Sequence, residues 1–198
     1  MKNYEYILAI APVVDAGTKR GEIDSTALLD EIRGYLDPAD ADLFDTLVGG
    51  FDAETLSRDF YLKALSSPCR FIREYFSTDL DVRNRKVRYL NRELGRPEGT
   101  DVMVLDEDTE RVFEDEARVD AILLKPDLIE RERGLDDYMW EKIEAMTELE
   151  VFTIDAVLGF VARLQIAARW LKLDPETGRE LFRKLVDEIR NNKKSIEQ

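Results

Sequence analysis

The residues whose types and spacing best suit chemistry are two aspartates, Asp79 and Asp81, followed closely by Arg83 and Asn84. A pair of carboxylates is what a carboxylate-based hydrolase needs for general acid–base work. These residues lie inside a predicted helix, one or two turns after Tyr75, so they could equally be solvated or paired with one another. Because the chain contains 43 acidic residues, some carboxylates are close by chance. We favour a solvated or internally paired polar stretch over a ligand site.

The chain has no histidine and one cysteine, Cys69. The first absence removes the commonest general acid–base group and metal ligand, which excludes zincin, Ser-His-Asp and Cys-His sites. A single cysteine can form neither an intramolecular disulfide nor a zinc cluster, and we interpret Cys69 as a structural thiol in a cytoplasmic protein. The chain also lacks a glycine-rich phosphate loop. We therefore predict no catalytic residue, no metal and no cofactor.

The composition is that of a folded, acidic protein. The 198 residues are 44% apolar and 36% charged, with a net charge of −14. This charge repels nucleic acid and anionic membranes and favours basic partners. Residues 151–173 are long enough to span a bilayer, but Asp155, Arg163, Arg169 and Lys172 make insertion costly. We predict no nucleic-acid partner and no direct membrane insertion.

Helix starts are marked by capping residues, several of them followed by proline. A cap oxygen accepts an unpaired backbone N–H, and proline at the first helical position lacks one. The predicted starts are Asp37-Pro38, Ser67-Pro68, Asp174-Pro175 and Pro126-Asp127, with Asp24 and Asp52 as further caps.

The apolar spacing predicts an all-α fold, a multi-helix bundle of about eight helices. We expect one helical domain over 1–198, with 1–96 and 97–198 as its sub-bundles. The N-terminal segment 3–12 is predicted to be a short strand or a buried extended piece, and 100–105 a short strand or an extended loop. The predicted helices are 24–36, 38–48, 53–66, 68–94, 108–123, 127–149, 152–173 and 175–193.

Helix 152–173 carries two apolar stripes, one through Val157, Val161 and Leu164 and the other through Phe152, Phe160 and Ala167. A helix that is apolar on two sides belongs in the middle of a bundle. Helix 175–193 has one stripe, so we place it on the outside, antiparallel to its predecessor.

Charge is divided unevenly in the middle of the chain. Basic residues dominate between Arg83 and Arg96, and acidic residues dominate between Glu98 and Asp120. One interpretation is a helical hairpin whose charged faces screen each other, and the other is a basic docking patch. We favour the hairpin.

Two resemblances point to a rotary ATPase. Residues 69–76 (CRFIREYF) and 81–84 (DVRN) resemble the aromatic-rich helix and Asp-x-x-Asn element of the C/d (AC39-type) subunits of V- and A-type ATPases. Most of the chain is similar to the uncharacterised bacterial family DUF2764, which is associated with V-type ATPase gene clusters. That similarity rests on residues 3–9 (NYEYILA), 167–174 (AARWLKLD), Gly178 and Leu185-Val186.

The resemblance implies a fold like that of the C/d subunits, with two stacked helical bundles, and a mechanical function. The chain would be a non-catalytic accessory or central-stalk component of a V/A-type ATPase. It would be cytoplasmic but peripheral to the inner membrane, with stalk or rotor-ring subunits as partners. The alternatives are a free-standing helical adaptor or regulator and, third, a carboxylate-based hydrolase. The predicted partner contacts are Arg70, Arg73, Asp81, Arg83, Asn84, Arg88 and Arg92.

Overall fold

The computed structural model of the chain describes residues 2–14, 24–105 and 112–172. Within these ranges the regular elements are eight α-helices and there is no strand, which confirms the predicted multi-helix all-α bundle. The predicted helix 175–193 and its Asp174-Pro175 start lie outside the described residues. The helices are α1 (Tyr4–Ile10), α2 (Ser25–Tyr35), α3 (Pro38–Gly49), α4 (Arg58–Leu65), α5 (Arg70–Glu93), α6 (Glu116–Leu123), α7 (Leu128–Thr147) and α8 (Ile154–Lys172).

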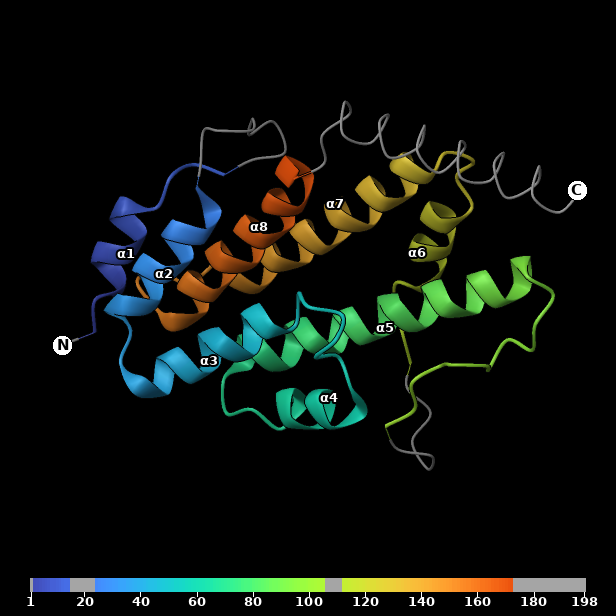
Figure 1. The fold of residues 1–198 in the computed structure, drawn as a ribbon, viewed down its shortest axis with the longest axis horizontal. Helices are drawn as coiled ribbons and strands as arrows, with labels where there is room; N and C mark the ends of the chain where they lie inside the picture. Colours follow the sequence, from blue (N-terminus) through green and yellow to red (C-terminus); the bar gives the residue numbers. More distant parts are fainter. Residues whose placement is uncertain (1, 15–23, 106–111, 173–198) are drawn as a thin grey trace, which may run out of the picture.

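Helix α8 lies among the other helices, as its two apolar stripes predict. It contacts α1, α2, α3, α5 and α7 (Figure 1). Val157, Leu158, Val161, Ala162 and Leu164 are completely buried. Because the apolar residues of α8 point in several directions, neighbours are needed on several sides of it. The single domain and its sub-bundles 1–96 and 97–198 stay predictions.

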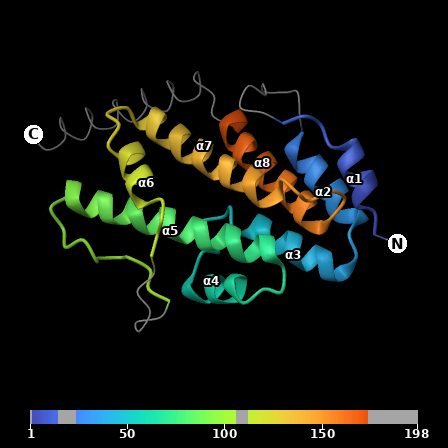
Figure 2. The same ribbon diagram turned by 180° about the vertical axis from the view of Figure 1, so that it is seen from behind.

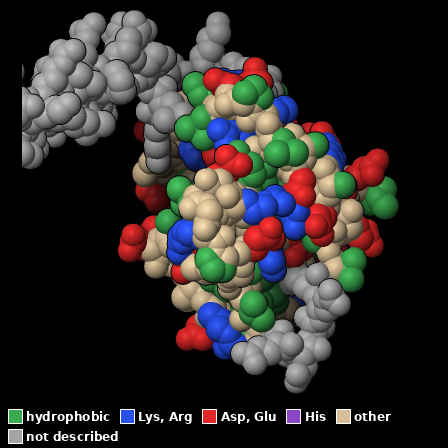
Figure 3. Space-filling model, turned by 90° about the vertical axis from the view of Figure 1, so that its right-hand side faces the viewer, with side chains coloured by type: hydrophobic (Ala, Val, Ile, Leu, Met, Phe, Trp, Pro, Cys, Tyr) green, Lys and Arg blue, Asp and Glu red, His purple; other side chains and the backbone are tan. Residues whose placement is uncertain are grey.

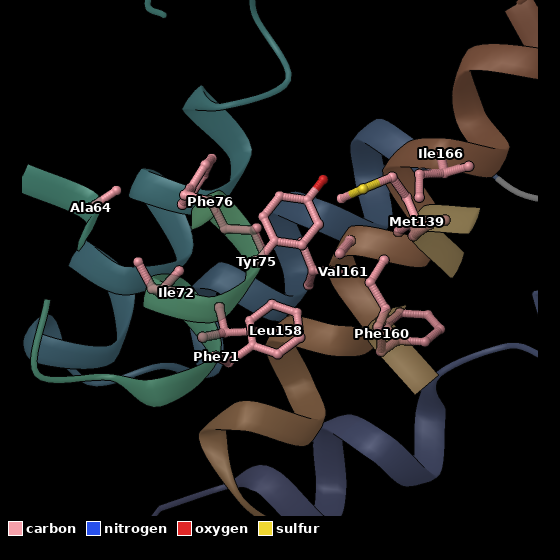
Figure 4. Close-up of a cluster of buried hydrophobic side chains, with 14 of the residues drawn as sticks. Ala64, Phe71, Ile72, Tyr75, Phe76, Met139, Leu158, Phe160, Val161 and Ile166 are labelled. Atoms are coloured by element: carbon pink, nitrogen blue, oxygen red, sulfur yellow. The ribbon is translucent and has the colours of Figure 1, made fainter. Parts of the chain in front are cut away.

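Helix α5 is the second organising element, and its 24 residues make it the longest described helix. It runs along the molecule and contacts α4, α6, α7 and α8 (Figures 1 and 2). Figure 4 shows Phe71 and Tyr75 of α5 beside Leu158 and Val161 of α8. The Phe71 and Tyr75 rings stack with centroids 5.8 Å apart. These aromatic side chains, placed at helical spacing, join α5 to α8.

Several of the predicted caps are present. Asp24 accepts hydrogen bonds from the backbone N–H groups of Thr26 and Ala27, each at 3.1 Å. Asp37 caps α3 through the Asp40 N–H at 3.0 Å, with Pro38 at the first helical position. Asp127 caps α7 through the N–H of Glu130 at 2.9 Å. Each carboxylate satisfies an N–H that the helix itself leaves unpaired.

The prediction of a strand or extended piece over 3–12 is wrong, because residues 4–10 form helix α1. Hydrogen bonds run from the Ile7 N–H to the Asn3 carbonyl at 2.9 Å and from the Ala11 N–H to the Ile7 carbonyl at 3.1 Å. Ile7 is completely buried, and Tyr4 and Leu8 pack against the same core. These residues follow helical spacing, but the segment is too short for its periodicity to stand out from an apolar run.

Three predicted helix starts are also corrected. The segment after Asp52 closes in turns, and α4 begins only at Arg58, capped by the Ser57 hydroxyl, which accepts from the Phe60 N–H at 3.2 Å. Helix α5 begins two residues after Pro68, because Ser67 accepts from the Cys69 N–H and so caps a turn. In the described part of 108–123 only Glu116–Leu123 is helical, and 108–111 lie outside it.

Gly159 allows α7 and α8 to approach closely. A Cβ on Gly159 would lie 2.6 Å from Thr147 Cγ2. The Thr147 hydroxyl donates to the Ile143 carbonyl at 2.8 Å, which holds that side chain in place. Any side chain at position 159 must therefore push α7 and α8 apart.

We expect Gly159→Ala to lower the free energy of unfolding by about 1–3 kcal/mol, measured by urea denaturation. Gly34→Ala, in the exposed part of α2 with open space around it, should instead raise that free energy by up to about 1 kcal/mol. Equal effects of the two substitutions would contradict this assignment.

Candidate functional site

Arg70 joins the start of α5 to the corner between α7 and α8. Its Nη2 donates to the Met146 carbonyl at 2.8 Å and to Glu150 Oε1 at 2.9 Å. The same nitrogen lies 3.3 Å from Asp155 Oδ2, and Nη1 pairs with Glu74 at 3.2 Å. Arg70 was predicted to contact a partner, but three carboxylates of this chain already surround its guanidinium. Its contacts hold the corner in place.

Cys69, next to Arg70, is a buried thiol. Its Sγ donates to Asp155 Oδ1 at 3.3 Å. Burial raises the pKa of Cys69 to about 11, and the Asp155 charge adds to this increase. A protonated, buried thiol fits the structural role expected for this residue.

Arg73 is also engaged within the chain. Its Nη1 donates to the Ser67 carbonyl at 2.7 Å and to the Pro68 carbonyl at 2.8 Å. Both carbonyls belong to the turn between α4 and α5, where no helix supplies them with a donor. Arg73 therefore fixes this turn.

The aspartates that suggested chemistry lie in two different environments. Asp79 Oδ2 accepts from Arg83 Nε at 2.7 Å and from the Tyr61 hydroxyl at 2.5 Å. Burial raises the pKa of Tyr61, and the Asp79 charge raises it further, so this hydroxyl keeps its proton. Asp81 is half-buried on another face of α5, near Tyr138. Burial raises the pKa of Tyr138 most, the bonded Asp115 raises it further, and the Asp81 charge adds a smaller increase. The two carboxylates thus do not form one site, and the geometry favours internal pairing.

Asn84 and Asn91 fasten the loop after α5 onto that helix. Asn84 Nδ2 donates to the Met103 carbonyl at 2.9 Å, and its Oδ1 accepts from the Met103 N–H at 2.9 Å. Two turns later, Asn91 Nδ2 donates to the carbonyls of Glu98 and Thr100 at 3.2 and 2.6 Å. A side-chain amide thereby pairs with Met103 as a neighbouring strand would. The loop closes in turns over 97–102 and forms no strand within 100–105.

We expect Asn84→Ala to lower the free energy of unfolding by about 1–3 kcal/mol, because a half-buried N–H and carbonyl of Met103 would lose their partner. Urea denaturation measures this loss, and hydrogen exchange at the Met103 amide should become faster. Arg92→Ala, on the same helix, is the control and should change stability by less than about 0.5 kcal/mol. Unchanged exchange at Met103 in the Asn84 variant would contradict the assignment.

Arg88 and Arg92, the remaining predicted contact residues, lie one turn apart on α5. Arg88 is half-buried and Arg92 is exposed. Within the described ranges neither makes a hydrogen bond or an ion pair through its side chain. They are therefore the two predicted contacts that the described residues leave available to another molecule.

The basic part of α5 and the acidic segment after it do screen each other. Arg85 Nε donates to Asp120 Oδ1 at 3.1 Å, and Nη1 lies 2.8 Å from Glu116 Oε1. Lys86 Nζ pairs with Glu132 of α7 at 2.5 Å. Figure 3, which faces this end of the molecule, shows Lys and Arg side chains interspersed with Asp and Glu where the surface is not grey. These contacts favour the hairpin interpretation over an extended basic patch.

Asp136 of α7 forms a buried junction that the sequence did not indicate. It accepts hydrogen bonds from Arg169 Nη2 and, at 2.6 Å, from Trp170 Nε1 of α8. Burial raises the pKa of Asp136, and the bond from Arg169 opposes that increase. One signal was present in the sequence, because Asp136 lies three residues before Met139 on the buried face of α7.

Tyr75 of α5 is buried close to Asp79 and Asp136. Burial raises the pKa of Tyr75, and the charges of Asp79 and Asp136 raise it further. The hydroxyl therefore keeps its proton.

A second polar cluster joins α1 to α3. Asp40 is 4% exposed, and its carboxylate accepts from Lys2 Nζ at 2.9 and 3.0 Å and from the Tyr4 hydroxyl at 2.5 Å. Asp40 lies in the first turn of α3, and the sequence gave no sign of its partners near the N-terminus. The cavity beside it measures about 230 Å³ and is lined by Lys2, Asn3, Tyr4, Tyr35, Leu36, Asp37 and Asp40. The carboxylate is occupied by groups of this chain, which makes the cluster a clamp between helices.

Asp115 links the start of α6 to α7 and gives the fold a pH dependence. Lys142 Nζ at 2.5 Å lowers the pKa of Asp115, and the Tyr138 hydroxyl, at 3.0 Å, lowers it further. The stabilisation is therefore complete above the pKa of about 3.9 that an unfolded aspartate has, and it is lost as the pH falls through the lower folded value.

We expect Asp115→Asn to lower the free energy of unfolding at pH 7 by a few tenths to about 1 kcal/mol, since the pair is partly exposed. The difference from the wild type should shrink as the pH falls below about 4. Urea denaturation across this pH range measures the effect. Asp137→Asn is the control, because exposed Asp137 makes no ion pair with a described residue. A difference that grows on acidification would contradict the expected sign.

The described residues show no arrangement suited to a metal or a membrane span. No group of three or more His, Cys, Asp or Glu residues among them could hold a metal ion. No helix in the described ranges is both long enough and apolar enough to cross a membrane. The charged side chains described above join helices to one another.

A family model matches the C-terminal part of the chain. Residues 107–193 match the model described as "Protein of unknown function (DUF2764)". No curated protein and no solved structure matches the chain. The family match covers less than half of the chain and supports the DUF2764 assignment indicated by the residues. It carries no link to a rotary ATPase.

Proposed function

We propose that the chain is a non-catalytic accessory or central-stalk subunit of a bacterial V/A-type ATPase, peripheral to the membrane complex, and that it acts by holding other subunits. The observation behind this proposal is that charged side chains of α5 are bound to other groups of the chain. Arg70, Asp79, Arg83 and Arg85 are all engaged in bonds that join or brace helices. A surface organised in this way suits binding by shape and charge, without bond-making chemistry.

The mechanical properties of α5 support the same proposal. Its 24 residues span roughly 36 Å. Arg70 fixes its start to the α7–α8 corner, and the hydrogen bond from Arg131 of α7 to the Tyr89 hydroxyl joins its last turns to α7. A helix held near both ends can transmit a load between partners without bending. The resemblance of 69–76 and 81–84 to C/d subunits supports a place in the rotary complex, and the DUF2764 match supports the family.

The alternative is a free-standing helical adaptor or regulator, which the same braced helices would serve. The two functions differ in their partners. A carboxylate-based hydrolase ranks third, because Asp79 and Asp136 are each occupied by groups of this chain.

Affinity purification of the tagged chain from native membranes, with quantitative mass spectrometry, tests the proposal. We expect ATPase subunits to be enriched about tenfold or more over a tag-only control. Partners that include no ATPase subunit, recovered from cells that express the ATPase, would favour the adaptor. An absence of any enriched protein would overturn the assembly role altogether.

Arg88 and Arg92 should contribute to that recovery, because no described residue occupies their guanidinium groups. We expect the charge-reversing double variant Arg88→Glu/Arg92→Glu to reduce recovery of the ATPase subunits about tenfold or more. Lys63→Glu/Lys125→Glu changes the charge equally at two exposed positions on α4 and after α6, and it should leave recovery unchanged. Equal recovery with both double variants would remove these arginines from the contact surface.

A further inference from the structure

The corner between α7 and α8 exposes three large apolar side chains within four residues. Leu149 is 90% exposed, Val151 67% and Phe152 52%. Apolar residues scattered singly over a surface are ordinary, but a contiguous group on one tight corner is characteristic of an interaction site. The feature to explain is why this corner points its side chains outward.

The backbone of the corner is held in an unfavourable conformation that keeps Phe152 exposed. Phe152 has a φ of +54°, in the left-handed region that a bulky residue rarely adopts. In the usual arrangement, the apolar residue before a helix cap packs against the fourth helical position, which here is Val157. Val157 is completely buried in the core, whereas Phe152 is half exposed. Such strain persists only where the surroundings impose it, and it is concentrated at functional sites.

Specific bonds impose this conformation. The Thr153 hydroxyl donates to Glu150 Oε2 at 2.9 Å and accepts from the Ala156 N–H at 3.2 Å. The Glu150 N–H donates to the Thr147 carbonyl at 3.0 Å, and the Glu150 side chain is bound by Arg70 of α5. The corner is thus fixed from both sides. Its backbone therefore loses little conformational freedom when a partner binds the apolar side chains.

The charges around the corner are mainly negative. Glu148 is exposed, Glu150 and Asp155 flank the apolar residues, and Glu74 faces the corner across Arg70. Arg70 is the cation that lies among these carboxylates, and it is paired with three of them. This field would repel both an anionic membrane and a second copy of the same corner, and it would attract a basic surface.

We infer that the α7–α8 corner is a docking knob: Leu149, Val151 and Phe152 enter an apolar pocket on a partner protein whose rim carries lysine and arginine. The inference rests on the proposed assembly role and names the surface and the partner chemistry. The exposed group Leu124, Leu128 and Ile129 at the other end of α7 is the natural comparison. It lies at regular helix ends, without backbone strain.

The test compares two triple variants in the purification described above. Leu149→Ser/Val151→Ser/Phe152→Gly removes the knob, and glycine adopts a positive φ without strain, so this variant should unfold at the same or a higher urea concentration. Leu124→Ser/Leu128→Ser/Ile129→Ser is the control. We expect the knob variant alone to lose recovery of the principal partner about tenfold or more, as is typical of an interface hot spot.

A photoreactive benzophenone amino acid in place of Phe152, with Leu124 as the control position, then locates the partner's site. We expect a crosslink from position 152 to an identified protein, at a segment of apolar residues flanked by lysine or arginine. A crosslink to an acidic segment would overturn the inference, and so would equal recovery with both triple variants.

Two further results would reassign the knob. Loss of binding to anionic phospholipid vesicles in the knob variant alone would make it a membrane contact. Loss of a dimer, measured by light scattering, would make it a self-association surface. If wild-type protein enriches no partner, the proposed assembly role fails together with the knob. If it enriches a partner equally in both triple variants, only the knob fails.

Discussion

Helix α8 is apolar on two sides, and the other helices are arranged so that they cover its apolar side chains. Its side chains from Val157 to Ala168 would expose a large apolar area if any one layer of neighbours were missing. Helices α1 to α3 cover part of it, and α5 and α7 cover the rest. Substitutions that disturb its close contact with α7 therefore act on the core as a whole.

Charged side chains in this protein fix helices relative to one another, whereas apolar side chains fill the core. A net charge of −14 destabilises the compact state through repulsion between like charges. Many Lys and Arg side chains, however, lie between helices, where each neutralises nearby carboxylates. Arg70 and Arg85 each contact two or more carboxylates on other elements or one turn away. Individually such pairs contribute little at a surface, but those that are partly buried fix the relative positions of the helices they join. The polar groups that suggested chemistry in the sequence thus take part in the packing.

The parts of the fold that depend on local rules could be predicted from the sequence. The two stripes placed α8 correctly, although Phe152 of the second stripe lies before the helix and is exposed. The side chains of Asp24, Asp37 and Asp127 cap helices as expected. Elements that depend on distant partners could not be predicted. Helix α1 owes its conformation to the burial of Ile7 against the core, and Asp136 owes its role to Arg169, 33 residues away. Asn84 fixes Met103 across 19 residues, and no local pattern encodes that bond.

The contact between Cys69 and Asp155 also allows the opening of the joint between α5 and α8 to be followed by labelling of the thiol. The thiol is the single cysteine of the chain, it is buried, and its proton is held by the neighbouring carboxylate. Because Cys69 is only 9% exposed, separation of the start of α5 from the start of α8 should increase the rate at which a thiol-specific reagent reaches it. The rate of labelling therefore measures how often this joint opens, without any introduced probe. Since Arg70 at the same joint also braces the α7–α8 corner, a bound partner that tightens the corner should slow the labelling of Cys69.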